Sequence, residues 1–255
     1  MANSDFHFGC CKQIALQCEL PEHIAHTIAC SNQAVDEAHE RGYIGTQKKA
    51  VTSKHNNLMK YILQNDITRE KILCFHFAPE DKGNGKYRVK MYGKMHKKLM
   101  TEARCAFLDR KWERLGILLH VIFDQYSHDG FSMRLHPENN VSGLIVDGKK
   151  LPWYHRVWIW AVKKPLGHME GIGKMDLYDC EWEAKGRPKK RNWGVFEKGV
   201  QDIMEYVFGY NQPWRVSNAV IRKGRELKKP DLKDFLNYNA DWHREAREVR
   251  YLILC

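Results

Sequence analysis

The strongest hydrophobic pattern in the chain lies in residues 112–127, whose sequence is WERLGILLHVIFDQYS. Apolar side chains occupy most sides of this stretch, which is typical of a helix buried on all faces. Residues 21–40 carry apolar positions at helical spacing after Pro21, and they predict an amphipathic helix. Residues 90–113 are rich in Lys, Arg, Leu, Met and Ala, which favour one long amphipathic helix.

The rest of the chain shows weaker helical patterns separated by turn signals. Three further helices are predicted, in residues 48–64, 193–209 and 231–252. Clusters of turn-forming residues predict loops at 78–86 and 185–191. The Asp147-Gly148 pair predicts a small hairpin near residues 140–155. Sustained alternation of polar and apolar positions occurs nowhere else, so the pattern predicts an all-α fold.

Length and composition agree with a folded protein. The chain has 255 residues, which is enough to bury a sizeable core. Hydrophobic residues make up 43% and charged residues 29%, which excludes a disordered chain. We expect a helical metal-binding catalytic domain in residues 1–212 and a C-terminal helical extension packed on it in residues 213–255.

Targeting signals and cysteine usage point to the cytoplasm. No stretch reaches about 18 consecutive apolar residues, so no membrane span is expected. The first residues, MANSDFHFGCC, lack the basic start and apolar run of a secretory signal. The eight cysteines include no C-x-x-C pair, which argues against a cysteine zinc ribbon. We therefore expect a cytoplasmic protein with mostly buried, reduced thiols.

Three titratable residues interrupt the apolar helix at regular intervals. His120, Asp124 and His128 follow one another at four-residue spacing, and about 100° per residue keeps them on one helical face. A buried carboxylate is costly unless it is paired or binds a cation, and neutral imidazoles supply no stable positive charge. A divalent metal satisfies this arrangement. The alternative is a neutral His–Asp hydrogen-bond network inside a helical core.

Other candidate ligands lie far away along the chain. Asp5 and His7 would point the same way in an extended segment and could close on one ion, whereas the alternative is an exposed tail. A histidine between two phenylalanines, such as His76, is more often a hydrogen-bonded core residue than a ligand. Further candidates are Asp36 on a half-buried helical face, His55, and His168 with acids at Glu170 and Asp176.

These residues occur in an order that resembles an uncharacterised bacterial family, a domain of unknown function. The matching segments are Asp5–His7, Val35–Ala38, His55, Phe75–Phe77, Leu115–Phe131 and Gly167–Asp176. That family in turn is similar to the zinc-dependent phospholipase C and single-strand nuclease superfamily. The resemblance implies an all-helical fold that binds three zinc ions in one cleft.

The resemblance also implies roles for individual residues. His120 and Asp124 would bind a first zinc together with Asp36 and either His55 or His76. The Asp124 carboxylate would bridge to a further ion. Another ion would be bound by His128, His168 and Asp176.

Two positions depart from the superfamily pattern. The acid that usually follows the last histidine by four residues is replaced here by Ile172, so Asp176 or Glu170 must substitute for it. Secreted members also use the amine of the mature N-terminus as a ligand. Because no signal for cleavage is expected here, Asp5 and His7 are the replacements that we expect.

This ligand set suggests a hydrolytic reaction. Nitrogen and carboxylate ligands suit zinc, and also manganese or iron. Two or three such ions suit phosphoester hydrolysis, because they activate water and stabilise the reacting oxygens. The candidate catalytic residues are Asp124 as a bridging carboxylate and Glu170 or Asp129 as a group that orients the water.

Two other hypotheses explain the same residues. His128-Asp129 could be the doublet of an HD-type phosphohydrolase, in which Asp129 rather than Asp124 would be essential. A protein without catalytic activity could use the ligands as a structural metal site with no open position.

The net charge of +11 bears on the substrate. Basic stretches with interleaved aromatic residues occur at Lys86–Lys98 and Lys185–Arg191, and they would attract an anionic phosphodiester. We prefer nucleic acid or a nucleotide over a phospholipid head group, and a solvated basic face is the alternative. The candidate substrate-binding residues are Lys94, Lys97, Lys98, Arg191 and Asn192.

Overall fold

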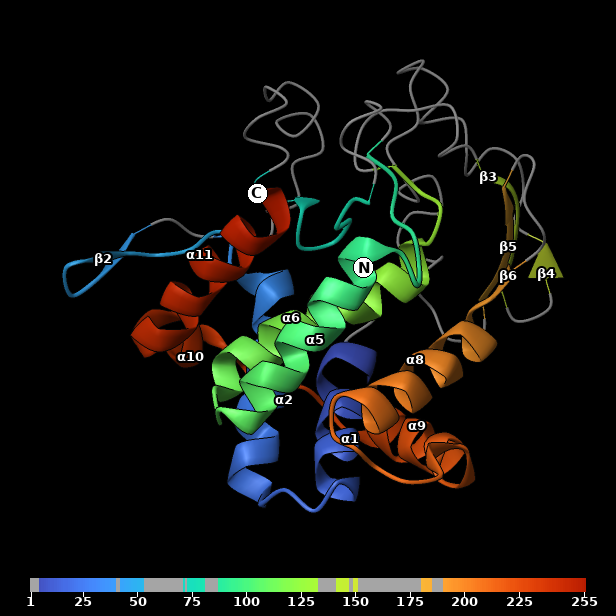
Figure 1. Ribbon diagram of the computed structural model, residues 1–255, viewed down its shortest axis with the longest axis horizontal. Helices are drawn as coiled ribbons and strands as arrows, with labels where there is room; N and C mark the ends of the chain where they lie inside the picture. Colours follow the sequence, from blue (N-terminus) through green and yellow to red (C-terminus); the bar gives the residue numbers. More distant parts are fainter. Residues whose placement is uncertain are drawn as a thin grey trace.

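Figure 1 shows a computed structural model of the chain. The structure describes residues 5–39, 42–52, 71, 73–80, 87–132, 141–146, 149–150, 180–184 and 190–255. Within these ranges the fold is mostly helical, and one hydrophobic core runs through it. None of the helices described there is both long and apolar enough to cross a membrane.

The centre of the fold is helix α6 (Trp112–His128), which is buried along almost its whole length. Helix α2 (Glu22–Glu37) packs against it, and both helices confirm the sequence prediction. Gly116 makes their close approach possible, because a Cβ at this position would lie 2.4 Å from the carbonyl oxygen of Ile28. The spacing between α2 and α6 therefore depends on the missing side chain.

Helix α5 (Lys94–Leu108) is shorter than the single helix that the sequence predicts over 90–113. It ends because Arg110 adopts a left-handed backbone conformation (φ 58°). The N–H groups of Arg110 and Lys111 then donate to the carbonyls of Phe107 and Ala106, in the pattern of a Schellman motif. This position usually carries glycine, so no residue type in the sequence signals the turn into α6.

The remaining helices surround the central pair (Figure 1). Helix α8 (Asn192–Tyr206) confirms the prediction for 193–209 and packs on α6. The predicted helix over 231–252 is divided into α10 (Lys233–Tyr238) and α11 (Ala240–Leu254). The division lies at Asn239, whose side chain accepts the N–H of Trp242 at 2.8 Å and caps α11.

Residues from the C-terminal part pack directly on the N-terminal elements. Trp242 is fully buried, and its indole Nε1–H donates to the carbonyl oxygen of Ser31 on α2 at 2.9 Å. A second contact between C-terminal and N-terminal elements joins α9 (Ser217–Glu226) to η1 (Asp5–Cys10), a short π-helical segment. There a Cβ on Gly9 would lie 2.0 Å from the carbonyl oxygen of Gly224, so two glycines allow the backbones to touch. The shorter helices nearby are α1 (Cys11–Gln17) and η6 (Pro213–Arg215).

A small antiparallel sheet lies beyond the end of α8 (Figure 1). The expected hairpin is present, since Val146 of β3 pairs with Lys149 of β4. Two strands that the sequence did not reveal complete the sheet in the order β4-β3-β5-β6, so the all-α prediction is corrected to a mostly helical fold. The strands are β3 (Val141–Val146), β4 (Lys149–Lys150), β5 (Cys180–Ala184) and β6 (Lys190–Arg191).

The predictions for two other segments are tested only in part. A hairpin of β1 (Tyr43–Ile44) and β2 (Gln47–Lys48) occupies the beginning of the helix predicted over 48–64, because Gly45 at positive φ turns the chain. The rest of that predicted helix lies outside the described residues. Most of the predicted loops at 78–86 and 185–191 lies outside them too.

Candidate metal centre

Helix α6 supplies the two central side chains of the site. His120 and Asp124 lie one turn apart on its buried face, and both are fully inaccessible to solvent. The Nε2 atom of His120 is 3.4 Å from Oδ2 of Asp124. The helical spacing seen in the sequence therefore brings these two side chains together as predicted.

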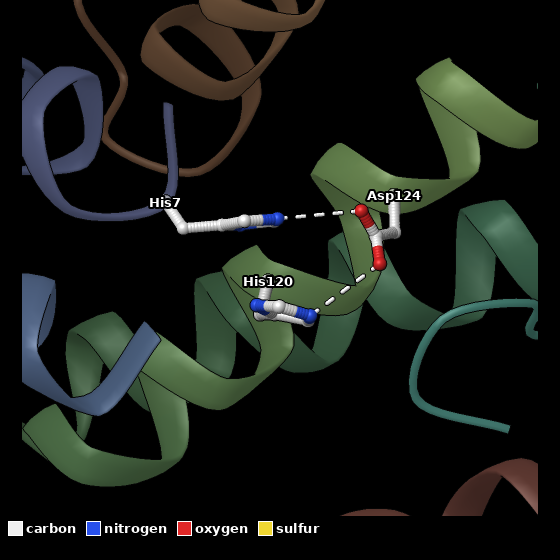
Figure 2. A group of neighbouring side chains, drawn as sticks. All are labelled: His7, His120 and Asp124. Carbon is white, nitrogen blue, oxygen red and sulfur yellow. Dashed lines mark ion pairs between the residues drawn. The ribbon is translucent and has the colours of Figure 1, made fainter. Parts of the chain in front are cut away.

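The N-terminal segment η1 brings His7 to the other oxygen of the same carboxylate. Figure 2 shows the two histidine rings on one side of Asp124, with His7 Nε2 at 3.3 Å from Oδ1. The rings of His7 and His120 are stacked, with centroids 3.9 Å apart and planes 20° from parallel. The expected extended segment is wrong, because this part of the chain is helical. Residues two apart in a helix do not face the same way, and Asp5 belongs to neither of the His/Asp groups described below.

His76 and Asp36 complete the cluster from two further segments. His76 Nδ1 is 2.8 Å from Asp124 Oδ2 and 3.3 Å from His120 Nε2. One oxygen of Asp36 lies 3.9 Å from the nearest nitrogens of His76 and His120, and its other oxygen lies 3.8 Å from His7 Nε2. His76 is thus a buried, hydrogen-bonded residue that lies within the cluster. Of the alternatives His55 and His76, the structure brings His76 to Asp124, and His55 lies outside the described residues.

These five side chains form two overlapping groups with the geometry of metal ligands. One group is His7, His120 and Asp124, and the other is Asp36, His76 and His120. In each group the candidate ligand atoms lie within 4.8 Å of one another. Each carboxylate offers one oxygen to His7 and the other to the pair His76 and His120. A carboxylate placed in this way can bridge two ions.

Burial and neighbouring charges shift the protonation of the cluster. Burial lowers the pKa of His120 to about 4, with a further contribution from His7, so this ring is neutral at pH 7. Burial opposes protonation of His7 as well, but the carboxylates of Asp36 and Asp124 outweigh it and raise the pKa of His7. Burial also opposes ionisation of Asp124, yet positive and imidazole neighbours hold the pKa of its carboxyl well below the ordinary value. The cluster therefore contains the ionised carboxylate of Asp124 beside the neutral imidazole of His120.

Protonation of the histidines does not by itself balance the carboxylate charges of this cluster. The described ion-pair partners of Asp36 and Asp124 are histidines, not lysines or arginines. The nitrogens of His76 and His120 face each other at 3.3 Å, and two protonated rings at this distance would repel by about 5 kcal/mol at an effective dielectric constant of about 20.

Several polar atoms in the cluster are buried without a hydrogen-bond partner. They are His7 Nε2, Asp36 Oδ1, His76 Nε2 and His120 Nδ1. Buried polar atoms are usually satisfied, so such a concentration requires an explanation. Two of them, His7 Nε2 and Asp36 Oδ1, are candidate ligand atoms that face the shared interior of the cluster. A divalent cation fits this donor set, because imidazole nitrogen and carboxylate oxygen are common zinc ligands.

The other candidates on α6 and beside it have different surroundings. His128 is buried, its Nδ1–H donates to the carbonyl oxygen of His76, and its ring stacks on Phe77 at 4.2 Å. Nδ1 protonation leaves Nε2 as the nitrogen with a lone pair, but His128 belongs to neither of the two groups. Asp129 lies in the turn after α6, where its Oδ1 accepts the N–H of Met91 at 3.0 Å. The structure therefore brings Asp124, not Asp129, into the cluster.

The candidate substrate-binding residues lie on different surfaces. Lys94, Lys97 and Lys98 are exposed on α5, and Lys98 donates to the carbonyl oxygen of Leu252. Arg191 is exposed and pairs with Glu181 at 3.1 Å. Asn192 is buried, so it is not part of an exposed basic surface. The candidates outside the described residues are His55, His168, Glu170 and Asp176.

One residue that contacts the cluster was missed in the sequence. Asn32 is fully buried on α2, and its Oδ1 lies 2.9 Å from His7 Nδ1. The available signal was its position one helical turn before Asp36, which places both side chains on the same face of α2. An asparagine on an amphipathic helix does not by itself indicate a partner near the N-terminus.

Comparison with known proteins identifies the family of the chain. The model of a family of unknown function, DUF6765, matches residues 2–254, and the chain belongs to this family. No curated protein and no solved structure matches the chain significantly. The expected membership of a family of unknown function is therefore confirmed, and the similarity to the zinc-dependent phospholipase C and nuclease superfamily stays a prediction.

Proposed function

We propose that this member of a family of unknown function is a metal-dependent phosphoester hydrolase with a polynuclear, zinc-type site. The observation that carries the proposal is the convergence of three histidines and two carboxylates, contributed by four separate segments, on one buried point. A purely structural ion needs four ligands and no access to solvent. Here Asp36 keeps a side chain that is 13% exposed, so one edge of the cluster reaches the surface.

The described residues offer ligands for two ions. His7 would help to hold one ion and His76 and His120 the other, and the Asp36 and Asp124 carboxylates each face both sets of histidines. Two divalent ions held in this way supply a water of lowered pKa and positive charge at the reacting oxygens. Nitrogen and oxygen ligands favour zinc, and manganese or iron suit the same donors.

In the proposed site, the side chains of the cluster would bind the ions, orient them and limit their contact with water. Asp124 fixes the separation of its histidine partners, because its two oxygens face different rings. His120 stays neutral at pH 7 because its pKa is lowered to about 4, so one of its ring nitrogens keeps a lone pair. Asp36 marks the side from which water and substrate approach, because the other four cluster side chains are buried.

The charge of the chain supports an anionic substrate. A net charge of +11 attracts phosphodiesters over a distance, and the three lysines of α5 are exposed. We therefore propose a phosphodiester of nucleic acid or of a nucleotide as the substrate. A phospholipid head group carries the same phosphodiester chemistry and is the alternative substrate.

The first experiment measures bound metal and hydrolysis on the same preparation. Wild type and Asp124→Asn are purified identically without a metal-binding tag, and metal per chain is determined by plasma mass spectrometry. We expect about two or three zinc-like ions in the wild type and fewer in the variant. The loaded protein is then tested on bis(4-nitrophenyl) phosphate, single-stranded DNA, RNA and phosphatidylcholine micelles.

Each outcome of this experiment has a separate meaning. Metal binding with hydrolysis of a nucleic acid or nucleotide ester supports the proposal, and hydrolysis of the micelles alone supports the lipid alternative. Bound metal without any hydrolysis, together with unfolding on chelation, identifies a metal-stabilised binding protein. Less than half an ion in a folded wild type contradicts the metal centre.

A further inference from the structure

Asn32 occupies an unusual position next to the candidate metal centre. Its side chain is fully buried on α2, and its amide oxygen lies 2.9 Å from Nδ1 of His7. His7 belongs to η1, which is 25 residues away in the sequence. Among the described residues, this is the hydrogen bond that links α2 to Nδ1 of His7.

This contact decides which nitrogen of His7 carries the proton. An amide oxygen accepts hydrogen bonds and does not donate them, so Nδ1 must be the donor. A neutral imidazole with a proton on Nδ1 has a lone pair on Nε2. That Nε2 atom has no hydrogen-bond partner, and it faces Asp124 Oδ1 at 3.3 Å and Asp36 Oδ2 at 3.8 Å.

When His7 is neutral, the facing atoms are a lone pair and two carboxylate oxygens, which repel unless a cation lies between them. We propose that Asn32 is a positioning residue that fixes the Nδ1–H form of His7 and so makes Nε2 a metal ligand. The inference rests on the metal centre of the proposed function but not on hydrolysis. It assigns to Asn32 the role that a hydrogen-bond acceptor behind a histidine ligand has in metal sites.

The position of Asn32 on α2 gives this role a structural basis. Asp36 lies one turn further along the same helix. Helix α2 therefore places Asn32 at Nδ1 of His7 and Asp36 near Nε2 of the same ring. The packing of α2 on α6 at Gly116 fixes this helix relative to Asp124. Loss of the acceptor would free the His7 ring to rotate or to take the other tautomer.

Two substitutions separate this role from a contribution to folding. Asn32→Asp keeps an oxygen acceptor for Nδ1–H, whereas Asn32→Leu has a similar size and no acceptor. Zinc affinity is measured by competition with a chromophoric chelator, and the stability of the metal-free protein is measured by thermal unfolding. Ser31→Ala is the matched control, because Ser31 is the buried polar neighbour on the same helix.

The variants are expected to rank differently in zinc affinity and in the stability of the metal-free protein. For zinc affinity, Asn32→Asp and Ser31→Ala stay close to the wild type, and Asn32→Leu is weaker by about 10- to 100-fold. For the metal-free protein, Asn32→Asp is the least stable variant, since it adds a third carboxylate near Asp36 and Asp124. Long-range ¹⁵N–¹H spectra of the zinc-loaded wild type should show the proton of His7 on Nδ1.

Three results would overturn the inference. Wild-type affinity in Asn32→Leu would show that the acceptor is not needed. A loss of affinity in Asn32→Asp as large as that in Asn32→Leu would show that the amide donates to His7 instead of accepting. No zinc binding by the wild type would contradict the metal centre itself, and bound zinc without hydrolysis would contradict only the proposed reaction.

Discussion

Replacing Asp124 by asparagine should lower the stability of the protein more in the presence of metal than in its absence. The substitution keeps the size of the side chain and removes one negative charge from a position that is fully buried. Without metal, the neighbours that hold the pKa of the Asp124 carboxyl below its ordinary value stabilise its ionised form in the folded protein, and burial opposes them. In excess chelator we therefore expect the variant to be less stable than the wild type, by the part of this stabilisation that burial does not cancel.

With metal the difference between wild type and variant should be larger, because the ligands bind the ion in the folded state. An ion present at about 100 times its dissociation constant adds about 2.7 kcal/mol to the free energy of unfolding. Unfolding entropies of about 2.1 cal/mol/K per residue convert this into about 5 °C in Tm for a chain of this length. The wild type should gain about this amount for each ion, and Asp124→Asn should gain much less, since Asp124 contributes to both ion positions.

The assay is thermal unfolding followed by circular dichroism, in chelator and in zinc, with Asp129→Asn as the matched control. Asp129 is an acid five residues further along that accepts the N–H of Met91 outside the cluster, so its variant should respond to zinc like the wild type. The reasoning is refuted if Asp124→Asn is destabilised equally in chelator and in zinc. That result would identify a neutral His–Asp hydrogen-bond network, and a loss of zinc response in Asp129→Asn would instead favour the HD-type doublet.

Three further substitutions test the packing around the site. Gly116→Ala adds a methyl group 2.4 Å from a carbonyl oxygen of α2, so it should cost about 1–3 kcal/mol of stability in urea unfolding and weaken zinc binding. Trp242→Phe removes the indole donor to α2 and should cost about 1 kcal/mol in the same assay. His243 accepts the N–H of Ala50 and donates to the carbonyl oxygen of Leu236, and burial is the main cause that lowers its pKa. Its contribution is therefore complete above the unfolded pKa of about 6.5 and is lost as the pH falls below it, so the stability difference between wild type and His243→Gln should shrink on acidification. An unchanged stability in any of the three variants would contradict the corresponding contact.

Much of the helical framework follows from local patterns. Helix α6 is apolar on most sides, and its four-residue spacing places His120 and Asp124 on one face whatever packs around them. Helices α2 and α8 follow from their own apolar spacing in the same way. By contrast, the end of α5 depends on an arginine in a left-handed conformation, and no local residue type signals this turn. The strands β5 and β6 are short, and they are strands because they pair with β3 and with each other.

Residue types and helical spacing are local properties, so the order of residues alone defines which side chains are available for a metal centre. The tertiary structure decided which of them meet. His7 reaches Asp124 because η1 is helical and its backbone touches α9 at Gly9. His76 joins the cluster because its Nδ1 lies against Asp124. Contacts of this kind join segments that are far apart along the chain, and they depend on how closely the backbones pack, which no single segment encodes.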